Sequence, residues 1–242
     1  MQANLNDRVY IVTGGSRGFG IAIAAALVQH GARVGLVSRN ASALEAAVAR
    51  LGADRAFAVG MDVSERADIA RAFTRIKEHF GRLDGLINNA GLARPGAVEN
   101  LDAADVQAQV GTNLLGTVYC CQAAIPLLRG GDNPRIVNIS SASAYHMDEM
   151  AHLSIYAATK AAVERFSRDL RRELQGDAIG VTILRPGAAA TEFAAGWDPS
   201  RFEPALKAWI DQGRLMDIGM DAAHVGATVA YCLCCPPGVS ID

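Results

Sequence analysis

The sequence lacks the features of membrane-spanning and nucleic-acid-binding chains. Its 242 residues contain no apolar run of about 18 residues, so we expect no membrane span. The 23 basic and 25 acidic side chains leave a net charge of -2, whereas a nucleic-acid-binding face needs a basic excess. A hydrophobic fraction of 50% beside a charged fraction of 20% excludes a disordered chain. The length suits one large α/β domain.

The start of the chain and its cysteines carry no targeting or metal signal. Residues 1–7 are short and polar, without a basic stretch followed by an apolar one, so we expect no signal peptide and a cytoplasmic protein. The polar segment 145–152 lacks ligand spacing, and we interpret it as a loop at a pocket mouth, with no metal. We interpret all five cysteines as small buried hydrophobes rather than as metal or redox groups: Cys120, Cys121, Cys232, Cys234 and Cys235.

Short β-branched runs alternate with alanine-rich segments along almost the whole chain. We expect strands at 8–13, 33–38, 56–60, 85–88, 135–140 and 180–185, and helices at 19–30, 42–51, 65–80, 102–128 and 154–175. Ser42, with Glu45 three residues on, is expected to cap the second helix. Strands that are apolar throughout fit a parallel sheet covered on both faces. The pattern therefore predicts a single domain over 1–242, a Rossmann-type doubly wound parallel sheet flanked by helices on both faces.

A glycine-rich loop, TGGSRGFG at 13–20, joins the first expected strand to the first expected helix. Glycines let the backbone turn sharply and approach a pyrophosphate, and the helix N-terminus adds free N–H groups and a positive dipole end. The spacing is GxxxGxG rather than the common GxGxxG. Its position between a strand and a helix predicts a dinucleotide-binding site.

The end of the second strand lacks the acidic residue with which NAD-binding proteins hold the ribose 2′-hydroxyl. The strand ends Val37-Ser38-Arg39. Arg39 can pair with a 2′-phosphate, Ser38 can donate a hydrogen bond, and Arg17 supplies a second cation. The alternative is that Arg39 is a solvated loop residue. We expect NADP(H) as the cofactor.

Only three lysines are present, and one of them, Lys160, lies four residues after Tyr156 on an expected helix. The two side chains then share a face. A lysine cation beside a phenol favours the phenolate, so we expect a lowered pKa for Tyr156. Such a phenol can exchange a proton with a carbonyl or an alcohol.

Taken together, the motifs resemble the short-chain dehydrogenase/reductase family. They occur in family order over nearly the whole chain: the glycine loop, NNAG at 88–91, Asn113, NISS at 138–141, YAATK at 156–160, and RPG at 185–187 followed by Thr191. The resemblance implies an oxidoreductase in which Tyr156 is the general acid and Lys160 holds the nicotinamide ribose and tunes Tyr156. It also implies that Ser141 bonds the substrate oxygen and that Asn113 helps hold a water linking Lys160 to solvent.

The resemblance also implies the cofactor-binding set. Asp62 faces the adenine amino group, with Val63 beside the ring. The remaining members are Gly14, Ser16, Arg17, Gly18, Phe19, Gly20, Ser38, Arg39, Asn89, Ala90, Gly91, Tyr156, Lys160, Pro186, Gly187 and Thr191. Helices of this family pair between subunits, which implies a homotetramer or homodimer.

The sequence departs from the family pattern at two places. Ser141 precedes Tyr156 by fifteen residues and Ser143 precedes it by thirteen, whereas the family places its serine closer. We favour Ser141, because it follows the apolar strand directly, and leave Ser143 as the alternative. The chain also stops at Asp242, where the family's seventh strand is just starting, so a shortened chain is an open alternative.

Residues 188–220 are expected to form a lid that holds most of the bulky apolar side chains: Phe193, Trp197, Phe202, Trp209, Met216 and Met220. They fit either an apolar or aromatic small-molecule substrate or plain packing of the lid. We expect an NADP(H)-dependent oxidoreductase that interconverts a ketone or aldehyde and an alcohol. A 3-oxoacyl thioester reductase is the alternative that Arg94, Arg129 and Arg201 leave open. A non-catalytic nucleotide-sensing protein is the distant one.

Overall fold

The computed structural model describes residues 5–145, 151–189, 191–212, 219–239 and 241. Six parallel strands form one sheet in the order β3-β2-β1-β4-β5-β6. Their bounds are β1 Val9–Thr13, β2 Arg33–Ser38, β3 Ala56–Gly60, β4 Gly85–Asn88, β5 Arg135–Ile139 and β6 Gly180–Leu184. The chain crosses from the β3 edge to β4, which pairs with β1. The expected doubly wound parallel sheet is thereby confirmed.

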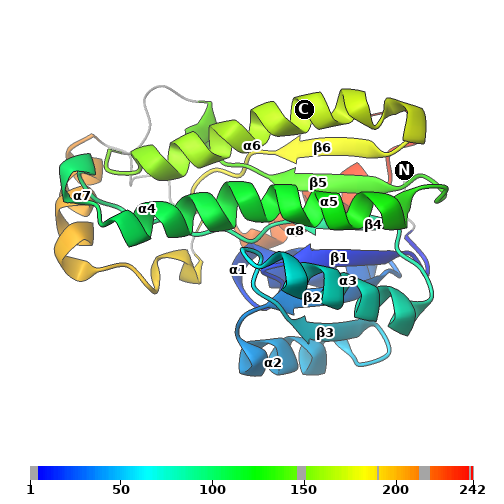
Figure 1. Ribbon diagram of the computed structural model, residues 1–242. Helices are drawn as coiled ribbons and strands as arrows, with labels where there is room; N and C mark the ends of the chain where they lie inside the picture. Colours follow the sequence, from blue (N-terminus) through cyan, green and yellow to red (C-terminus); the bar gives the residue numbers. More distant parts are fainter. Residues whose placement is uncertain (1–4, 146–150, 190, 213–218, 240, 242) are drawn as a thin grey trace.

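Helices cover both faces of the sheet, because each face of a buried parallel sheet is apolar. One face packs against α3 (Arg66–Phe80), α5 (Gly116–Leu128) and α6 (Ser154–Glu173). The other packs against α1 (Gly18–Gln29), α2 (Ala41–Leu51) and α8 (Ala222–Leu233). Figure 1 shows α5 and α6 in front of the sheet and α1 and α8 behind it. Two apolar cores result, one on each side, and together they fix the strand ends that carry the site.

Two local expectations are corrected. The cap of α2 is Asn40, not Ser42: the Asn40 side-chain oxygen accepts from the Ala43 N–H at 3.0 Å and from the Ser42 hydroxyl at 2.9 Å. The expected helix 102–128 is also interrupted. It consists of α4 (Ala103–Gln109), a π-helical segment (Val110–Leu115) and α5. Within the π segment, the backbone oxygen of Asn113 accepts from the Thr117 hydroxyl at 2.8 Å.

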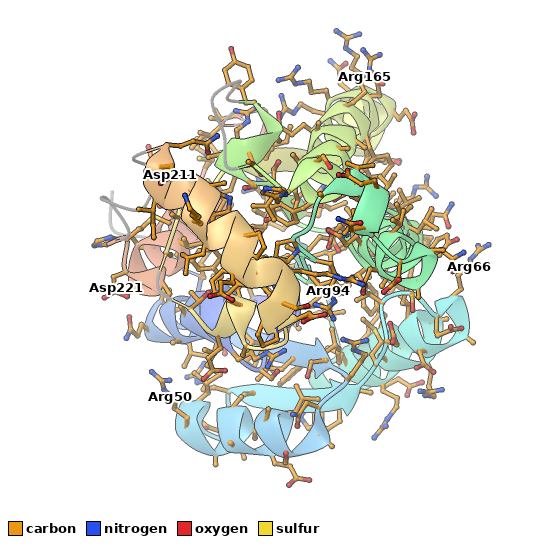
Figure 2. The ribbon with its side chains drawn as sticks, turned by 90° about the vertical axis from the view of Figure 1, so that its left-hand side faces the viewer. Arg50, Arg66, Arg94, Arg165, Asp211 and Asp221 are labelled. Carbon is orange, nitrogen blue, oxygen red and sulfur yellow. The ribbon has the colours of Figure 1, made fainter. Side chains whose placement is uncertain are left out.

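The last elements lie at the carboxyl edge of the sheet or behind it. Helix α7 (Pro199–Asp211) projects beyond the strand ends in Figure 1, and in Figure 2 it crosses the front of the molecule. None of the described residues after α8 belongs to a strand. Within the part of the chain that the structure describes, no helix is long and apolar enough to cross a membrane.

Candidate active site

A long cavity of about 1310 Å³ opens at the carboxyl ends of the strands. In open α/β sheets, ligands bind at this edge, where the strand order reverses. Small-molecule pockets usually measure about 300–1,000 Å³, so this cavity has room for a dinucleotide and a substrate together. Most of the predicted site residues line it: Gly14, Ser16, Arg17, Gly18, Phe19, Ser38, Arg39, Asp62, Val63, Asn89, Ala90, Gly91, Ser141, Tyr156, Pro186, Gly187 and Thr191. The predicted residues that do not line the cavity each contact one that does: Gly20 contacts Gly14, Asn113 contacts Leu92, and Lys160 lies beside Gly91.

The glycine loop has the shape of a phosphate cradle. Gly14 and Gly18 adopt φ values of 63° and 53°, which side-chain-bearing residues rarely adopt. A Cβ on Gly20 would lie 2.0 Å from the Gly14 carbonyl oxygen, so the start of α1 is pressed against the loop. Arg17 is the N-cap residue and makes no side-chain cap. The first N–H groups of α1 are therefore available to a phosphate.

Asn89 fastens this cradle to the end of β4. Its side-chain amide donates to the backbone oxygen of Thr13 at 2.9 Å. In return, the Thr13 hydroxyl accepts from the N–H groups of Asn89 and Ala90 at 3.0 and 2.9 Å. The residues expected along the adenosine ribose thus also hold the loop in place.

The far corner of the cavity brings Ser38, Arg39 and Asp62 together. The Arg39 guanidinium lies 3.7 Å from the Asp62 carboxylate, and its side chain is 69% exposed. Partial burial acts to raise the pKa of Asp62, but hydrogen bonds from Ser64 and the charge of Arg39 outweigh it and lower the pKa. Sequence analysis placed both residues here but did not predict that they would contact each other.

Tyr156 lies in the first turn of α6 and lines the cavity. Burial raises its pKa, and a hydrogen bond with Ser141 acts in the opposite direction. The expected lowering of this pKa is therefore wrong for the protein as the structure shows it. The physical reason is that desolvation of the phenolate outweighs the stabilising contacts.

Lys160 stands behind Tyr156, one helical turn on. Its ammonium donates to the Ile139 carbonyl at 2.8 Å and lies 5.8 Å from the centre of the Tyr156 ring. The side chain is 4% exposed, and burial lowers the pKa of Lys160 to about 8. A lysine with this pKa exchanges its proton readily near neutral pH.

The geometry favours Ser141 over Ser143 as the partner of Tyr156. The Ser141 hydroxyl oxygen accepts from the Ser143 N–H at 3.2 Å and from the Ser143 hydroxyl at 2.8 Å. Ser143 thus orients Ser141, which contacts the tyrosine. The neighbouring positions His146, Asp148 and Glu149, which lie in the polar segment, fall outside the described residues.

Asn113 is fully buried in the π segment and ties two elements together. Its side chain accepts from the Leu92 N–H and donates to the Leu92 carbonyl, both at 2.9 Å, and donates to the Thr159 hydroxyl at 3.0 Å. A Cβ on Gly91 would lie 3.4 Å from both the Asn113 side-chain oxygen and the Lys160 ammonium. The side chain of Asn113 therefore positions the loop after β4 beside Lys160. Its expected role in holding a water stays a prediction.

Sequence analysis missed a buried ion pair behind these groups. Glu164, 7% exposed, binds Arg185 through both carboxylate oxygens at 2.6 and 2.8 Å. It also accepts from the Ser140 hydroxyl at 3.0 Å, and that hydroxyl lies 3.3 Å from the Lys160 carbonyl oxygen. This cluster of Ser140, Glu164 and Arg185 joins the segments that carry Ser141, Lys160 and Pro186. The available signal was Glu164 four residues after Lys160, which places both on one helix face.

The lid covers the other side of the cavity with aromatic rings. Phe193 is 43% exposed, and its ring centre lies 5.8 Å from that of Tyr156. Trp197, Phe202 and Trp209 form mutual edge contacts with centres 5.2–5.9 Å apart. The Trp209 indole donates to the Ala151 carbonyl at 2.7 Å. Met220 packs on the core beside α1, and Met216 lies outside the described residues.

Charges at the N-termini of α4 and α7 also hold the lid. Arg201 of α7 binds Asp102 and, at 2.6 Å, Asp105. Arg129, by contrast, pairs with Asp177 away from the cavity.

Of the cysteines, Cys120, Cys121, Cys232 and Cys235 are buried, and burial raises the pKa of the Cys121 thiol to about 12. A protonated buried thiol is a poor nucleophile and a poor metal ligand.

Comparisons with known proteins show the family of this chain. A family model described as short chain dehydrogenase matches residues 8–201. An oxidoreductase from Botryotinia fuckeliana is 37% identical over 187 residues, which cover 77% of this chain and 68% of that protein. A 3-oxoacyl-acyl-carrier-protein reductase from Bos taurus is 33% identical over 218 residues, covering 90% of this chain and 89% of that protein.

Solved structures superpose over almost the whole chain. A serine dehydrogenase complexed with NADP+ has a TM-score of 0.85 at 29% identity, covering 96% of this chain and 92% of that one. A short chain dehydrogenase from Burkholderia cenocepacia in complex with NADP has a TM-score of 0.83 at 34% identity, covering 99% and 98%. A 3-ketoacyl-(acyl-carrier-protein) reductase from Brucella melitensis, complexed with NADH, has a TM-score of 0.84 at 28% identity, covering 99% and 97%.

Proposed function

Because this chain belongs to the short-chain dehydrogenase family, we propose that it is an NADP(H)-dependent oxidoreductase that interconverts a ketone or aldehyde and an alcohol. The observation that carries the proposal is the contact between Tyr156 and Ser141 on the cavity wall, with Lys160 buried behind it. A binding-only protein has no need of such a proton relay, which argues against a nucleotide sensor. The apolar lid favours an apolar or aromatic substrate.

The residues of this chain would bind and protonate the substrate, while the bound nicotinamide supplies or accepts the hydride. Because the side chains of Ser141 and Tyr156 contact each other, both hydroxyls can bond the same carbonyl oxygen. Burial keeps Tyr156 protonated, so that it can give its proton to that oxygen during reduction and take it back during oxidation. Lys160, whose pKa is near 8, can then restore the proton.

The residues present fit a dinucleotide with an additional phosphate. The glycine loop offers backbone N–H groups to a pyrophosphate. At the end of β2, Ser38 and Arg39 line the cavity together with Arg17, and β2 itself does not end in an acid, which would repel a 2′-phosphate. Asp62 follows β3 and lies 3.7 Å from Arg39, so a phosphate on Arg39 would displace this carboxylate, which would then be left for the adenine.

The first test is a fluorescence titration of the purified protein with NADPH and with NADH. We expect tighter binding of NADPH, because a phosphate on Arg39 adds a charge-assisted hydrogen bond. Arg39→Asp should shift the ratio of the two dissociation constants towards NADH by about 10- to 100-fold. An unchanged ratio would mean that Arg39 does not contact the phosphate, and binding of neither cofactor would overturn the proposed enzyme.

A 3-oxoacyl thioester reductase is the second candidate. It is favoured by the relatives from Bos taurus and Brucella melitensis that carry this activity in their names.

We also infer a cytoplasmic homodimer or homotetramer. The half-buried Ala162 and Phe166 on α6 and the exposed Leu115 support subunit pairing, and a single monomer mass in light scattering would contradict it.

A further inference from the structure

We propose that Arg94 binds an anionic group of the substrate, so that the enzyme acts on apolar or aromatic carbonyl compounds that carry a carboxylate or phosphate away from the reacting carbon. This inference rests on the function proposed above and adds a substrate class to it. It starts from the position of Arg94 in the cavity.

Arg94 lies in the loop after β4, at the substrate end of the cavity. Its own N–H donates to the side-chain oxygen of buried Gln109 at 3.2 Å. Ala93, just before it, packs in the apolar cluster with Leu153 and Trp209, against which Tyr156 also packs. The Arg94 side chain lines the cavity, and Figure 2 shows it beside α7. The base of this arginine is therefore fixed close to the catalytic tyrosine.

The other cations of the cavity lie at its cofactor end. Arg17 belongs to the glycine loop and Arg39 follows β2. Among the described lining residues, Arg94 is the one cation on the substrate side. Glu192, next to Phe193, is the acidic residue among the described lining residues on this side, so an anion of the substrate is favoured at Arg94 and disfavoured near the lid residue Phe193.

The guanidinium of Arg94 has donors to spare. A guanidinium carries five N–H donors. One nitrogen donates to the Ala93 carbonyl at 3.1 Å, and another lies 3.4 Å from the Asp105 carboxylate. The second oxygen of that carboxylate is held by Arg201 at 2.6 Å. With a side chain that is 33% exposed, Arg94 can offer a fork of donors to a ligand while Asp105 remains bound to the lid.

Three groups then define the substrate. Its carbonyl oxygen meets Ser141 and Tyr156, its apolar body lies against Phe193 and Trp197, and its anion meets Arg94. A charge pair beside aromatic side chains is stronger than one in bulk solvent. The anion can come from two sources: the carboxylate of a small acid or the phosphate of a pantetheine arm.

The test compares ketones that differ only in charge. With NADPH, wild-type protein should reduce 4-acetylbenzoate or 3-benzoylpropionate with a higher kcat/KM than the corresponding methyl esters. Arg94→Gln should lower kcat/KM for the acids by about 10- to 100-fold and for the esters by less than about 3-fold, as expected for a lost charge-assisted bond. Equal losses for acid and ester, together with equal losses for the phosphorylated and unphosphorylated pantetheine thioesters described below, would show that Arg94 is structural and would overturn the proposal.

A second variant should act in the opposite direction. Asp105→Asn removes the carboxylate charge that competes for Arg94. Because Asp105 also ties α7 through Arg201, the KM for the esters reports any loosening of the lid. Relative to that of the esters, the KM for the acids should fall by about 3-fold. An unchanged ratio of the two KM values would contradict the proposal.

The source of the anion is settled by acetoacetyl-phosphopantetheine compared with acetoacetyl-pantetheine. If the loss in Arg94→Gln appears with the phosphate pair and not with the acids, the ligand is the carrier arm. A reductase that uses neutral ketones without any anion preference refutes this inference but keeps the proposed function. Absence of turnover with every ketone refutes the function itself.

Discussion

The two sides of the cavity hold their functional groups by different kinds of contact. On the strand side, Lys160, Asn113 and Glu164 are buried, and each bonds backbone or side-chain polar groups at 2.6–3.0 Å. On the lid side, Phe193 and Trp197 meet other rings edge to face, and α7 is tied down by an indole and by ion pairs. Directional bonds fix reacting atoms, whereas apolar contacts accept ligands of varied shape. We therefore expect catalysis to depend on the strand side and substrate choice on the lid.

The largest effect is expected from Tyr156→Phe, on the strand side. This change removes the proton donor and keeps the ring, so kcat should fall by about 100- to 10,000-fold. The dissociation constant for NADPH should change little, as fluorescence titration would show. If Tyr156→Phe retained turnover, the expectation that catalysis depends on the strand side would be wrong.

Glu164→Gln should produce the next largest effect. It removes the carboxylate charge that Arg185 binds through two bonds, and removing one member of a largely buried pair costs up to about 3 kcal/mol of unfolding free energy. We expect a lower kcat in addition, because Ser140 and the Lys160 backbone lose their support. Urea denaturation and steady-state kinetics measure the two effects.

Two matched controls belong to this pair. Glu164→Asp should restore part of the unfolding free energy and part of the kcat lost in Glu164→Gln. The second control is the double variant that combines Glu164→Gln with Arg185→Met. In a double-mutant cycle the double variant should be less destabilised than the sum of the singles. Additive losses would mean that the two residues act independently.

Lys160→Met tests how the strand side depends on pH. The pKa of Lys160 is about 8 in the folded protein and 10.5 as the reference value. Between these values the unfolded chain binds more protons, so wild-type stability rises with pH, while the variant lacks this contribution. Wild type should thus gain about 2 kcal/mol over the variant between pH 7 and pH 9.5. A difference that stays flat with pH would mean that burial does not perturb this lysine.

The smallest effect is expected on the lid. Trp209→Phe keeps a ring in the aromatic cluster but loses the hydrogen bond to Ala151, which is worth about 1 kcal/mol. The KM for an apolar ketone should rise by about 2- to 10-fold at an unchanged kcat and an unchanged NADPH affinity. A large loss in kcat would instead place the lid in the chemistry.

The same contrast explains what the sequence predicts. The parallel sheet, its helices and most of the cavity lining follow from short motifs, because each motif lies at a strand end and the fold brings those ends together. Local periodicity also placed Tyr156 and Lys160 on one face of α6.

The missed features arise from contacts between distant segments. The π segment at Val110–Leu115 coincides with bonds from Asn113 to Leu92 and Thr159, which no local pattern shows. The raised pKa of Tyr156 comes from burial by the whole fold. The cap of α2 is a local exception: the helix begins at Ala41, and Asn40, two residues before the expected range, accepts from the Ala43 N–H.

The contact between Gly20 and the Gly14 carbonyl has a consequence for the evolution of this protein. Since even a methyl group does not fit between α1 and the loop, nearly every substitution at Gly20 would disrupt both at once. The exposed Arg39, by contrast, can be replaced without disturbing any packing. If Arg39 holds the cofactor's phosphate as proposed, selection on cofactor choice can act at the end of β2 while the glycine loop stays unchanged.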